Sequence, residues 1–194
     1  LTGASHKKVG PRFIPKILGN IAAANIAIDY NIQGPSFTVS TACSSGGDAI
    51  NTACMCMQSG KADIMLAVGA ESVLCPLVIY SLANAKALSR RNDSPSTASR
   101  PFDVTRDGFV IGEGGGALVL ETEESANGRN ARKYAEIKGY AQAHRPVSYD
   151  NSEVDSKAVV EVIEKACVNA GIEADNIDFV CCDDRKIIKT LMPC

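Results

Sequence analysis

The stretch Thr41-Ala42-Cys43-Ser44-Ser45-Gly46-Gly47 places one cysteine between a β-branched segment and a predicted helix. A helix start presents free N–H groups and the positive end of the helix dipole, and both stabilise a thiolate. The same N–H groups could bind the oxyanion that forms when a thioester is attacked. The pattern therefore favours a nucleophilic Cys43, although position alone leaves a buried structural cysteine open.

Other chemistries fit the sequence less well. Ser44 and Ser45 lack a G-x-S-x-G elbow, and no histidine stands in a motif that would supply a base for a serine or cysteine hydrolase. Residues 112–117 fit G-x-G-x-x-A, but a strand follows them where a dinucleotide site needs a helix. We therefore expect no bound nucleotide and no cofactor.

A metal site is also not expected. Cys54-x-Cys56 and Cys181-Cys182 do not have the spacing of zinc ligands, and the only histidines are His6 and His144. The eight cysteines lie mostly within apolar segments, which favours reduced thiols in an intracellular protein over a disulfide framework.

The elements around Cys43 should form a parallel βαβ unit. Residues 36–41 predict a strand, residues 44–59 a helix closed by Gly60, and residues 64–68 a second strand. Apolar side chains cover most of the circumference of the central helix, so we expect it to be buried between sheets.

The rest of the chain alternates helices and strands. A helix is predicted over residues 13–31, and another runs from 74 to 89 after Pro76. A long polar loop should then cover 90–108. The remaining expected elements are strands at 117–120, 134–140 and 177–181 and an amphipathic helix at 156–171.

Composition describes an ordinary globular chain of 194 residues, with 45% apolar and 22% charged residues. The formal net charge of −2 argues against a nucleic-acid binder. No apolar run is long enough to predict a membrane span, and no signal peptide is visible. The missing initiator Met suggests that the sequence begins within a larger protein.

Several motifs, taken together and in order, resemble those of the β-ketoacyl-[acyl-carrier-protein] synthases, most closely the elongating type. The resemblance extends from Gly10 to Gly139, and more loosely to Asp178. The matching stretches are Ser40–Gly46, Ala62–Glu71, Ala87–Asp93, Ala98–Asp103 and Arg106–Gly114.

This resemblance implies an α/β fold of the thiolase type, layered α/β/α/β/α, built from two similar halves. Residues 1–140 would form most of the first half, which bears the nucleophile, and residues 141–194 the start of a truncated second half. The implied reaction is acyl transfer to Cys43 followed by decarboxylative Claisen condensation with malonyl-carrier protein, in fatty-acid or polyketide synthesis.

The resemblance also assigns roles to individual residues. Lys7, Lys8 and Lys86 match positions that face the acidic acyl carrier protein or its phosphopantetheine, with ordinary solvated lysines as the alternative. Phe13 and Leu82 match positions that line the acyl pocket, Phe13 from across a homodimer interface, although either could be a core residue. The implied location is the cytoplasm, or a plastid or mitochondrion in a eukaryote.

The sequence departs from the family pattern after Phe179-Val180. Where the family has Asn-Ala-His-Gly-Thr, the chain reads Cys181-Cys182-Asp183-Asp184-Arg185, and neither His6 nor His144 stands in a family motif. Each such missing group usually contributes a factor of roughly 10² to 10⁴ in rate. We therefore expect that this chain alone cannot condense, and a non-catalytic binding or dimerisation subunit stays open as a second reading.

Overall fold

The computed structural model describes residues 9–144 and 156–181. Two compact units divide the chain: the first comprises Leu1–Gly69 and Gly116–Arg132, and the second Ala70–Gly115 and Lys133–Cys194. The helices are α1 (Phe13–Ile17), α2 (Ile21–Asp29), α3 (Ser45–Gln58), α4 (Pro76–Asn84), α5 (Glu123–Gly128) and α6 (Ser156–Ala170). The strands are β1 (Ile64–Glu71) and β2 (Gly114–Glu121), and the short 3₁₀ turns are η2 (Ala42–Ser44), η3 (Pro95–Thr97) and η4 (Ala174–Asn176).

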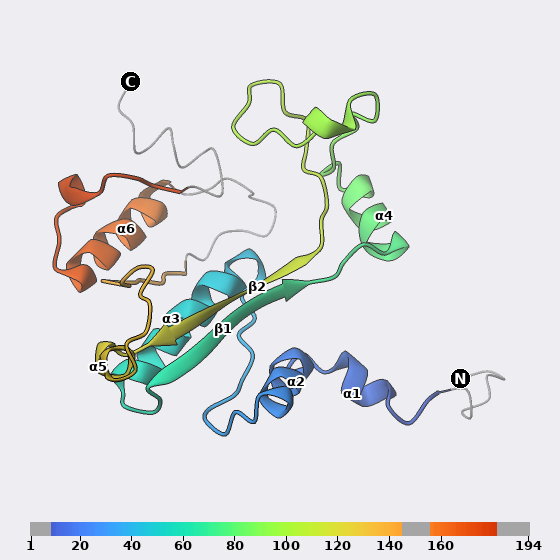
Figure 1. The fold of residues 1–194 in the computed structure, drawn as a ribbon. Coiled ribbons are helices and arrows are strands. Elements are labelled where there is room, and N and C mark those ends of the chain that lie inside the picture. Colours follow the sequence, from blue (N-terminus) through green and yellow to red (C-terminus); the bar gives the residue numbers. More distant parts are fainter. Residues whose placement is uncertain (1–8, 145–155, 182–194) are drawn as a thin grey trace. The chain divides into compact units, whose positions relative to one another are not determined.

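Strands β1 and β2 pair in one two-stranded sheet, and their arrows run in opposite directions (Figure 1). The Thr122 N–H donates to the Asp63 carbonyl oxygen at 2.9 Å and closes one end of the pair. The predicted strands at 64–68 and 117–120 are therefore confirmed. The predicted parallel pairing of residues 36–41 with residues 64–68 is wrong, because the described partner of β1 is β2, which runs antiparallel to it (Figure 1) and lies much later in the chain.

Residues 36–41 form no strand, contrary to the sequence prediction. The Thr38 hydroxyl donates to the Gly19 carbonyl oxygen at 3.2 Å, so this segment is tied to the break between α1 and α2. β-branched composition favours an extended backbone, but a strand also needs a neighbour that completes its ladder. Within the described ranges no such neighbour pairs with residues 36–41.

The single helix predicted over residues 13–31 is two helices. Leu18 adopts an extended conformation with ψ 132°, which ends α1, and Gly19 and Asn20 separate it from α2. The Ile21 N–H donates to the Leu18 carbonyl oxygen at 3.1 Å and starts the second helix. Apolar periodicity continued across the break, so the pattern alone did not reveal it.

Five helices end in the same way, with a left-handed residue just past the last turn. These residues are Asn31, Gly60, Lys86, Asn130 and Gly171, with φ between 52° and 68°. Each donates its N–H to a carbonyl three residues earlier, and the following N–H reaches five residues back, which is the Schellman pattern. Gly60 thus closes α3 as predicted, and Gly171 follows the predicted amphipathic helix α6.

In the second unit, the predicted strand at 134–140 is absent because this segment packs against α6. A Cβ on Gly139 would lie 2.5 Å from the Ala166 carbonyl oxygen, so the backbones approach closely. The Tyr140 N–H donates to Asn169 Oδ1 at 3.0 Å. Residues 177–181 also form no strand. The helix predicted at 74–89 is present but shorter: α4 begins at Pro76 and ends at Asn84. Residues 90–108 form the expected loop around η3.

Helix α5 was not predicted, although its start has a sequence signal. Thr122 is its N-cap and accepts a hydrogen bond from the Ser125 N–H at 3.3 Å. Glu123 and Glu124 occupy the first turn, where negative charge complements the helix dipole. A helix of this length carries too little apolar periodicity to stand out.

Few described side chains are buried. The buried apolar residues are Ala53, Ala67, Ala98, Ala126 and Cys167. Helix α3 was expected to be covered all round, yet Met55 on it is 57% exposed. On β2, the neighbours Leu118 and Val119 point to opposite faces and are 51% and 65% exposed. The buried-helix prediction is therefore wrong for the described residues, because they supply one small sheet and not two covering layers.

None of the described helices is both long enough and apolar enough to cross a membrane.

Candidate active site

Cys43 lies in the short turn η2, immediately before α3, and is exposed. The residue before it, Ala42, has φ +53°, a left-handed conformation that costs a side chain with a Cβ about 1–2 kcal/mol. Such outliers persist only where the surrounding structure holds them. Helix α3 has 14 residues, so Cys43 stands beside the first turn of a full-length helix, as the sequence predicted.

The turn around Cys43 is closed by hydrogen bonds from its neighbours. The Thr41 N–H donates to Ser45 Oγ at 2.9 Å, and that hydroxyl donates to the Ala42 carbonyl oxygen at 2.7 Å. The Ser44 hydroxyl donates to the Thr41 carbonyl oxygen at 2.8 Å. These bonds use the polar groups on both sides of Cys43 and leave its thiol exposed.

Asp48, in the first turn of α3, lies beneath this turn and is buried, with 6% exposure. Its Oδ2 accepts hydrogen bonds from the Thr41 hydroxyl at 2.5 Å and from the Ser44 hydroxyl at 3.2 Å. Sequence reasoning missed this residue. Ser44 occupies the N-cap position of α3, but its hydroxyl binds no N–H of the helix.

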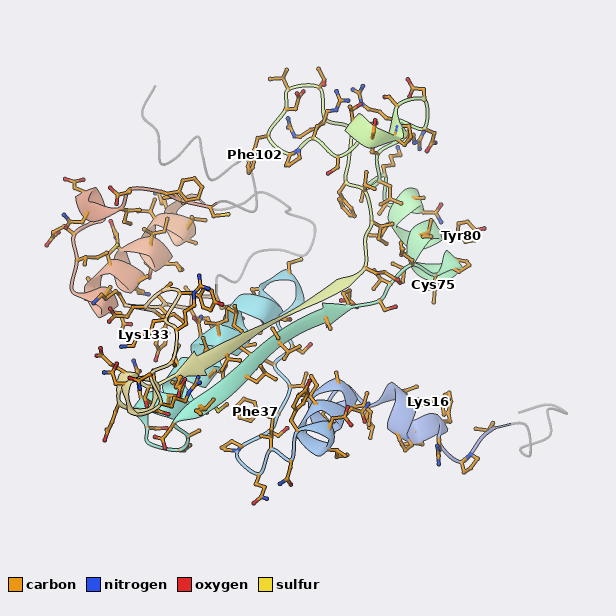
Figure 2. The ribbon with its side chains drawn as sticks, viewed as in Figure 1. Lys16, Phe37, Cys75, Tyr80, Phe102 and Lys133 are labelled. Atoms are coloured by element: carbon orange, nitrogen blue, oxygen red, sulfur yellow. The ribbon has the colours of Figure 1, made fainter. Side chains whose placement is uncertain are left out.

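The other cysteines of the described chain differ from Cys43 in their surroundings. All six described cysteines are free thiols. Burial raises the pKa of the Cys54 thiol, which lies half-buried on α3. Cys75 is exposed at the start of α4 (Figure 2) and is the N-cap of that helix. Cys75 therefore offers an exposed thiol at a helix start, outside the motif around Cys43.

Of the remaining predicted site residues, the structure describes Phe13, Leu82 and Lys86. Phe13 is the first residue of α1, in the first unit, and is 51% exposed. Leu82, on α4 in the second unit, is partly exposed, and Lys86 just beyond that helix is exposed. The Leu82 carbonyl oxygen accepts from the Ala87 N–H at 3.0 Å, so Leu82 and Lys86 share one helix-end motif. Lys7 and Lys8 fall outside the described residues.

Two of the motifs recognised in the sequence meet in the second unit. The Ser89 hydroxyl donates to Asp107 Oδ1 at 2.7 Å, and the Arg90 N–H donates to Oδ2 at 3.0 Å. The Ser89 bond, followed by the Arg90 N–H, lowers the pKa of Asp107. Next to it, the Ser89 N–H donates to the Phe109 carbonyl oxygen at 3.0 Å. These bonds fasten the two ends of the long polar loop.

The glycine-rich stretch leads directly into β2, as predicted, and not into a helix. Glu113, at its centre, accepts hydrogen bonds from the Ser72 hydroxyl at 3.0 Å and from the Leu74 N–H at 2.7 Å. Its carboxylate therefore joins the glycine-rich stretch to the segment that precedes α4. The described ranges contain no cluster of three His, Cys, Asp or Glu side chains arranged as metal ligands.

Comparisons with known proteins agree on one family. The beta-ketoacyl synthase N-terminal domain family matches residues 1–126. Over 175 residues, the chain is 40% identical to "3-oxoacyl-[acyl-carrier-protein] synthase 2" of Rhizobium meliloti (strain 1021), covering 90% of this chain and 42% of the relative. It is 41% identical to the mitochondrial "3-oxoacyl-[acyl-carrier-protein] synthase" of Arabidopsis thaliana, covering 90% of this chain and 38% of the relative. The chain thus spans about two fifths of the length of these curated relatives.

A solved structure supports the same conclusion about the fold. A ketosynthase complex described as a "type II PKS acyl-carrier protein in complex with its ketosynthase bound to the hexaketide" superposes with a TM-score of 0.84 and 34% identity. It covers 89% of this chain, and the matched region is 43% of the solved chain. The predicted thiolase-like α/β fold is therefore confirmed.

Proposed function

Because the chain belongs to the β-ketoacyl synthase family, we propose that it carries the acyl-accepting cysteine of a 3-oxoacyl-[acyl-carrier-protein] synthase, and that this residue is Cys43. The observation that carries the proposal is the exposed thiol in a closed turn at the start of α3. That position provides both an accessible nucleophile and nearby helix N–H groups that stabilise negative charge.

The acyl transfer follows from this geometry. The Cys43 thiolate attacks the carbonyl carbon of an acyl thioester, and the negative charge moves to the carbonyl oxygen. First-turn N–H groups of α3 stabilise that oxyanion. When the intermediate collapses, a new bond joins the acyl carbon to Cys43 Sγ. The bond to the carrier's sulfur breaks, and the departing thiolate takes a proton.

The whole protein would then condense the acyl group with malonyl-carrier protein, with loss of carbon dioxide. This chain has no histidine in the family context after Phe179-Val180. We therefore propose that this chain accepts an acyl group on Cys43 but does not complete the condensation. The division at residues 1–140 and 141–194 is part of the same proposal.

The proposed partner is an acyl carrier protein, and Lys7, Lys8 and Lys86 are the proposed contacts. One structural relative is described as a ketosynthase in complex with such a carrier. Lys86 is exposed and has φ +57°, a conformation that disfavours a lysine, so a role for its ammonium would explain its presence. Attraction between this ammonium and an acidic carrier would weaken as salt increases.

Phe13 and Leu82 are the proposed acyl-pocket residues, with Phe13 acting across a homodimer. Their partial exposure in separate helices is compatible with surfaces that a partner or a substrate covers. For the compartment we propose the cytoplasm, or a plastid or mitochondrion in a eukaryote. One relative of similar identity is named as mitochondrial.

The test is acylation by a labelled acyl-carrier thioester, followed by peptide mapping of the labelled cysteine. We expect label on Cys43, none in a Cys43→Ser variant, and full labelling in a Cys75→Ser variant, since Cys75 is exposed at a helix start outside the motif. With malonyl-carrier protein added, no β-ketoacyl product should form.

Two outcomes would contradict the proposal. An unlabelled Cys43 that stays inert, together with tight pairing to a complete synthase, would favour a binding or dimerisation subunit. Measurable β-ketoacyl product from this chain alone would show that the condensing groups are present after all.

A further inference from the structure

Asp48 connects the residues on the two sides of Cys43. Its Oδ2 accepts the Thr41 hydroxyl, two residues before the cysteine, and the Ser44 hydroxyl, one residue after it. The carboxylate is buried, and within the described ranges it forms no ion pair. The two described partners of this buried carboxylate are hydroxyl groups, so its hydrogen bonding depends on both donors and the three side chains hold one another in place.

We propose that Asp48 is a positioning residue for Cys43, whose carboxylate holds the turn from which the thiol projects by fixing the hydroxyls of Thr41 and Ser44. The inference rests on the proposed function, because it assumes that Cys43 is the nucleophile. It goes beyond that function because it assigns a role to a side chain that does not touch the substrate.

The backbone conformation explains why the turn needs the hydrogen bonds to Asp48. Ala42 has φ +53°, and the segment before it forms no strand that would fix its direction. The hydrogen bonds that close the turn come from Ser44 and Ser45, and the Ser44 hydroxyl is shared between the Thr41 carbonyl oxygen and Asp48. Without the carboxylate, the Thr41 hydroxyl loses its acceptor and the strained residue can relax.

Geometry and charge predict different results for substitutions at Asp48. A negative charge close to Cys43 opposes the formation of a thiolate, so the charge by itself would make the cysteine less reactive. Asp48→Asn removes the charge but keeps a carbonyl oxygen with two lone pairs, which can accept both hydroxyls. Asp48→Ala removes the charge and the acceptor together. A positioning role therefore predicts that Ala is harmful and that Asn restores function.

The test measures alkylation of individual cysteines by iodoacetamide, followed peptide by peptide with mass spectrometry from about pH 6 to about pH 10. We expect Asp48→Ala to reduce the limiting rate at Cys43 about tenfold, with Asp48→Asn within about threefold of the parent chain. Cys75, in the second unit, should react equally in all three proteins.

A matched control is Thr52→Val. The Thr52 hydroxyl donates to the backbone oxygen of Asp48 at 2.6 Å and makes no bond to its carboxylate. This variant removes a hydroxyl from the same helix but keeps the hydrogen bonds of the Asp48 carboxylate to Thr41 and Ser44. Its alkylation rate at Cys43 should therefore equal that of the parent chain. Thr41→Val and Ser44→Ala each remove one donor to the carboxylate, and each should lower the rate less than Asp48→Ala does.

Cys54 reports on the helix itself, because it lies half-buried on α3. Rapid alkylation of Cys54 in Asp48→Ala would mean that helix α3 has opened in that variant. The Thr41→Val variant then tests the proposal, and an unchanged alkylation rate at Cys43 in that variant would overturn it. If Cys43 is reactive in the parent chain and its alkylation rate is the same in Asp48→Ala, the positioning role of Asp48 is overturned and the proposed function stays intact. A Cys43 no more reactive than Cys75 in the parent chain would refute both.

Discussion

Lys86 and Gly60 occupy the same position relative to their helices, one residue past the C-cap, with φ +57° and +68°. In each case the residue's N–H and the next N–H bond to carbonyls of the last turn. Glycine adopts this conformation freely, whereas a lysine must bring its Cβ close to a carbonyl oxygen. The other helix ends of this kind use Asn or Gly, so Lys86 is the exception among the described helices.

Substitution of Lys86 should separate stability from carrier binding. Lys86→Gly removes the strain and should raise the free energy of unfolding by about 1 kcal/mol in urea titrations. The same variant should weaken binding to an acidic carrier protein about threefold at low salt, since one exposed charge contact is lost. Lys86→Arg keeps both the charge and the strain, and should resemble the parent chain in both measurements. Equal carrier affinity for the Gly variant and the parent would remove Lys86 from the proposed docking surface.

Gly108 should not accept a side chain. It has φ +146°, and an added Cβ would lie 2.5 Å from the Leu88 carbonyl carbon and 2.5 Å from the Ser89 nitrogen, both backbone atoms that cannot move alone. We expect Gly108→Ala to lower the free energy of unfolding by about 2 kcal/mol or more in urea titrations. Gly112→Ala is the matched control, because a Cβ there meets no atom within 4 Å. Similar losses in the two variants would show that the loop ends are not in close contact.

Glu121 should contribute to the loss of stability at low pH. Arg129 binds its carboxylate at 2.9 Å through Nε and 2.6 Å through Nη2, and with Ser125 this lowers the pKa of Glu121 to about 2. Because the folded pKa lies below the ordinary value of 4.5, this stabilisation is complete above about pH 4.5 and is lost as the pH falls towards 2.

Urea titrations at a series of pH values test this directly. Glu121→Gln should be less stable than the parent at neutral pH and should lose less stability on acidification. Glu136→Gln is the control, because its ion pair with Lys138 is exposed on both sides, at 69% and 63%. If Glu121→Gln loses as much stability on acidification as the parent chain does, other carboxyl groups cause that loss.

Two of the longer helices were predictable because their signals are local. Gly60 indicated the end of the helix predicted at 44–59, and the spacing of apolar residues indicated the helix predicted at 156–171. The predicted strands at 36–41, 134–140 and 177–181 failed for the opposite reason. Each is apolar or β-branched enough to extend, but a ladder depends on a neighbour that the segment itself does not encode.

The candidate site was predictable in the same partial way. Cys43 stood out by type and position. Asp48 was missed, although its spacing of four residues from Ser44 is a signal that the two side chains lie on one side of the helix start. The bond from Thr41 to Asp48 could not be foreseen, since it depends on the left-handed backbone at Ala42. Alanine gives no sequence signal for that conformation, as glycine would.

The hydrogen bond from Thr122 to Asp63 joins two strands that lie far apart in the chain. Strand β1 is synthesised before β2, and residues 72–113 separate the two strands in the chain. Until β2 is available, the apolar segment 64–71 has no strand partner, and unpaired apolar segments of this kind are prone to aggregation. The nascent chain therefore passes through a period of exposure whose length is set by the rate of translation.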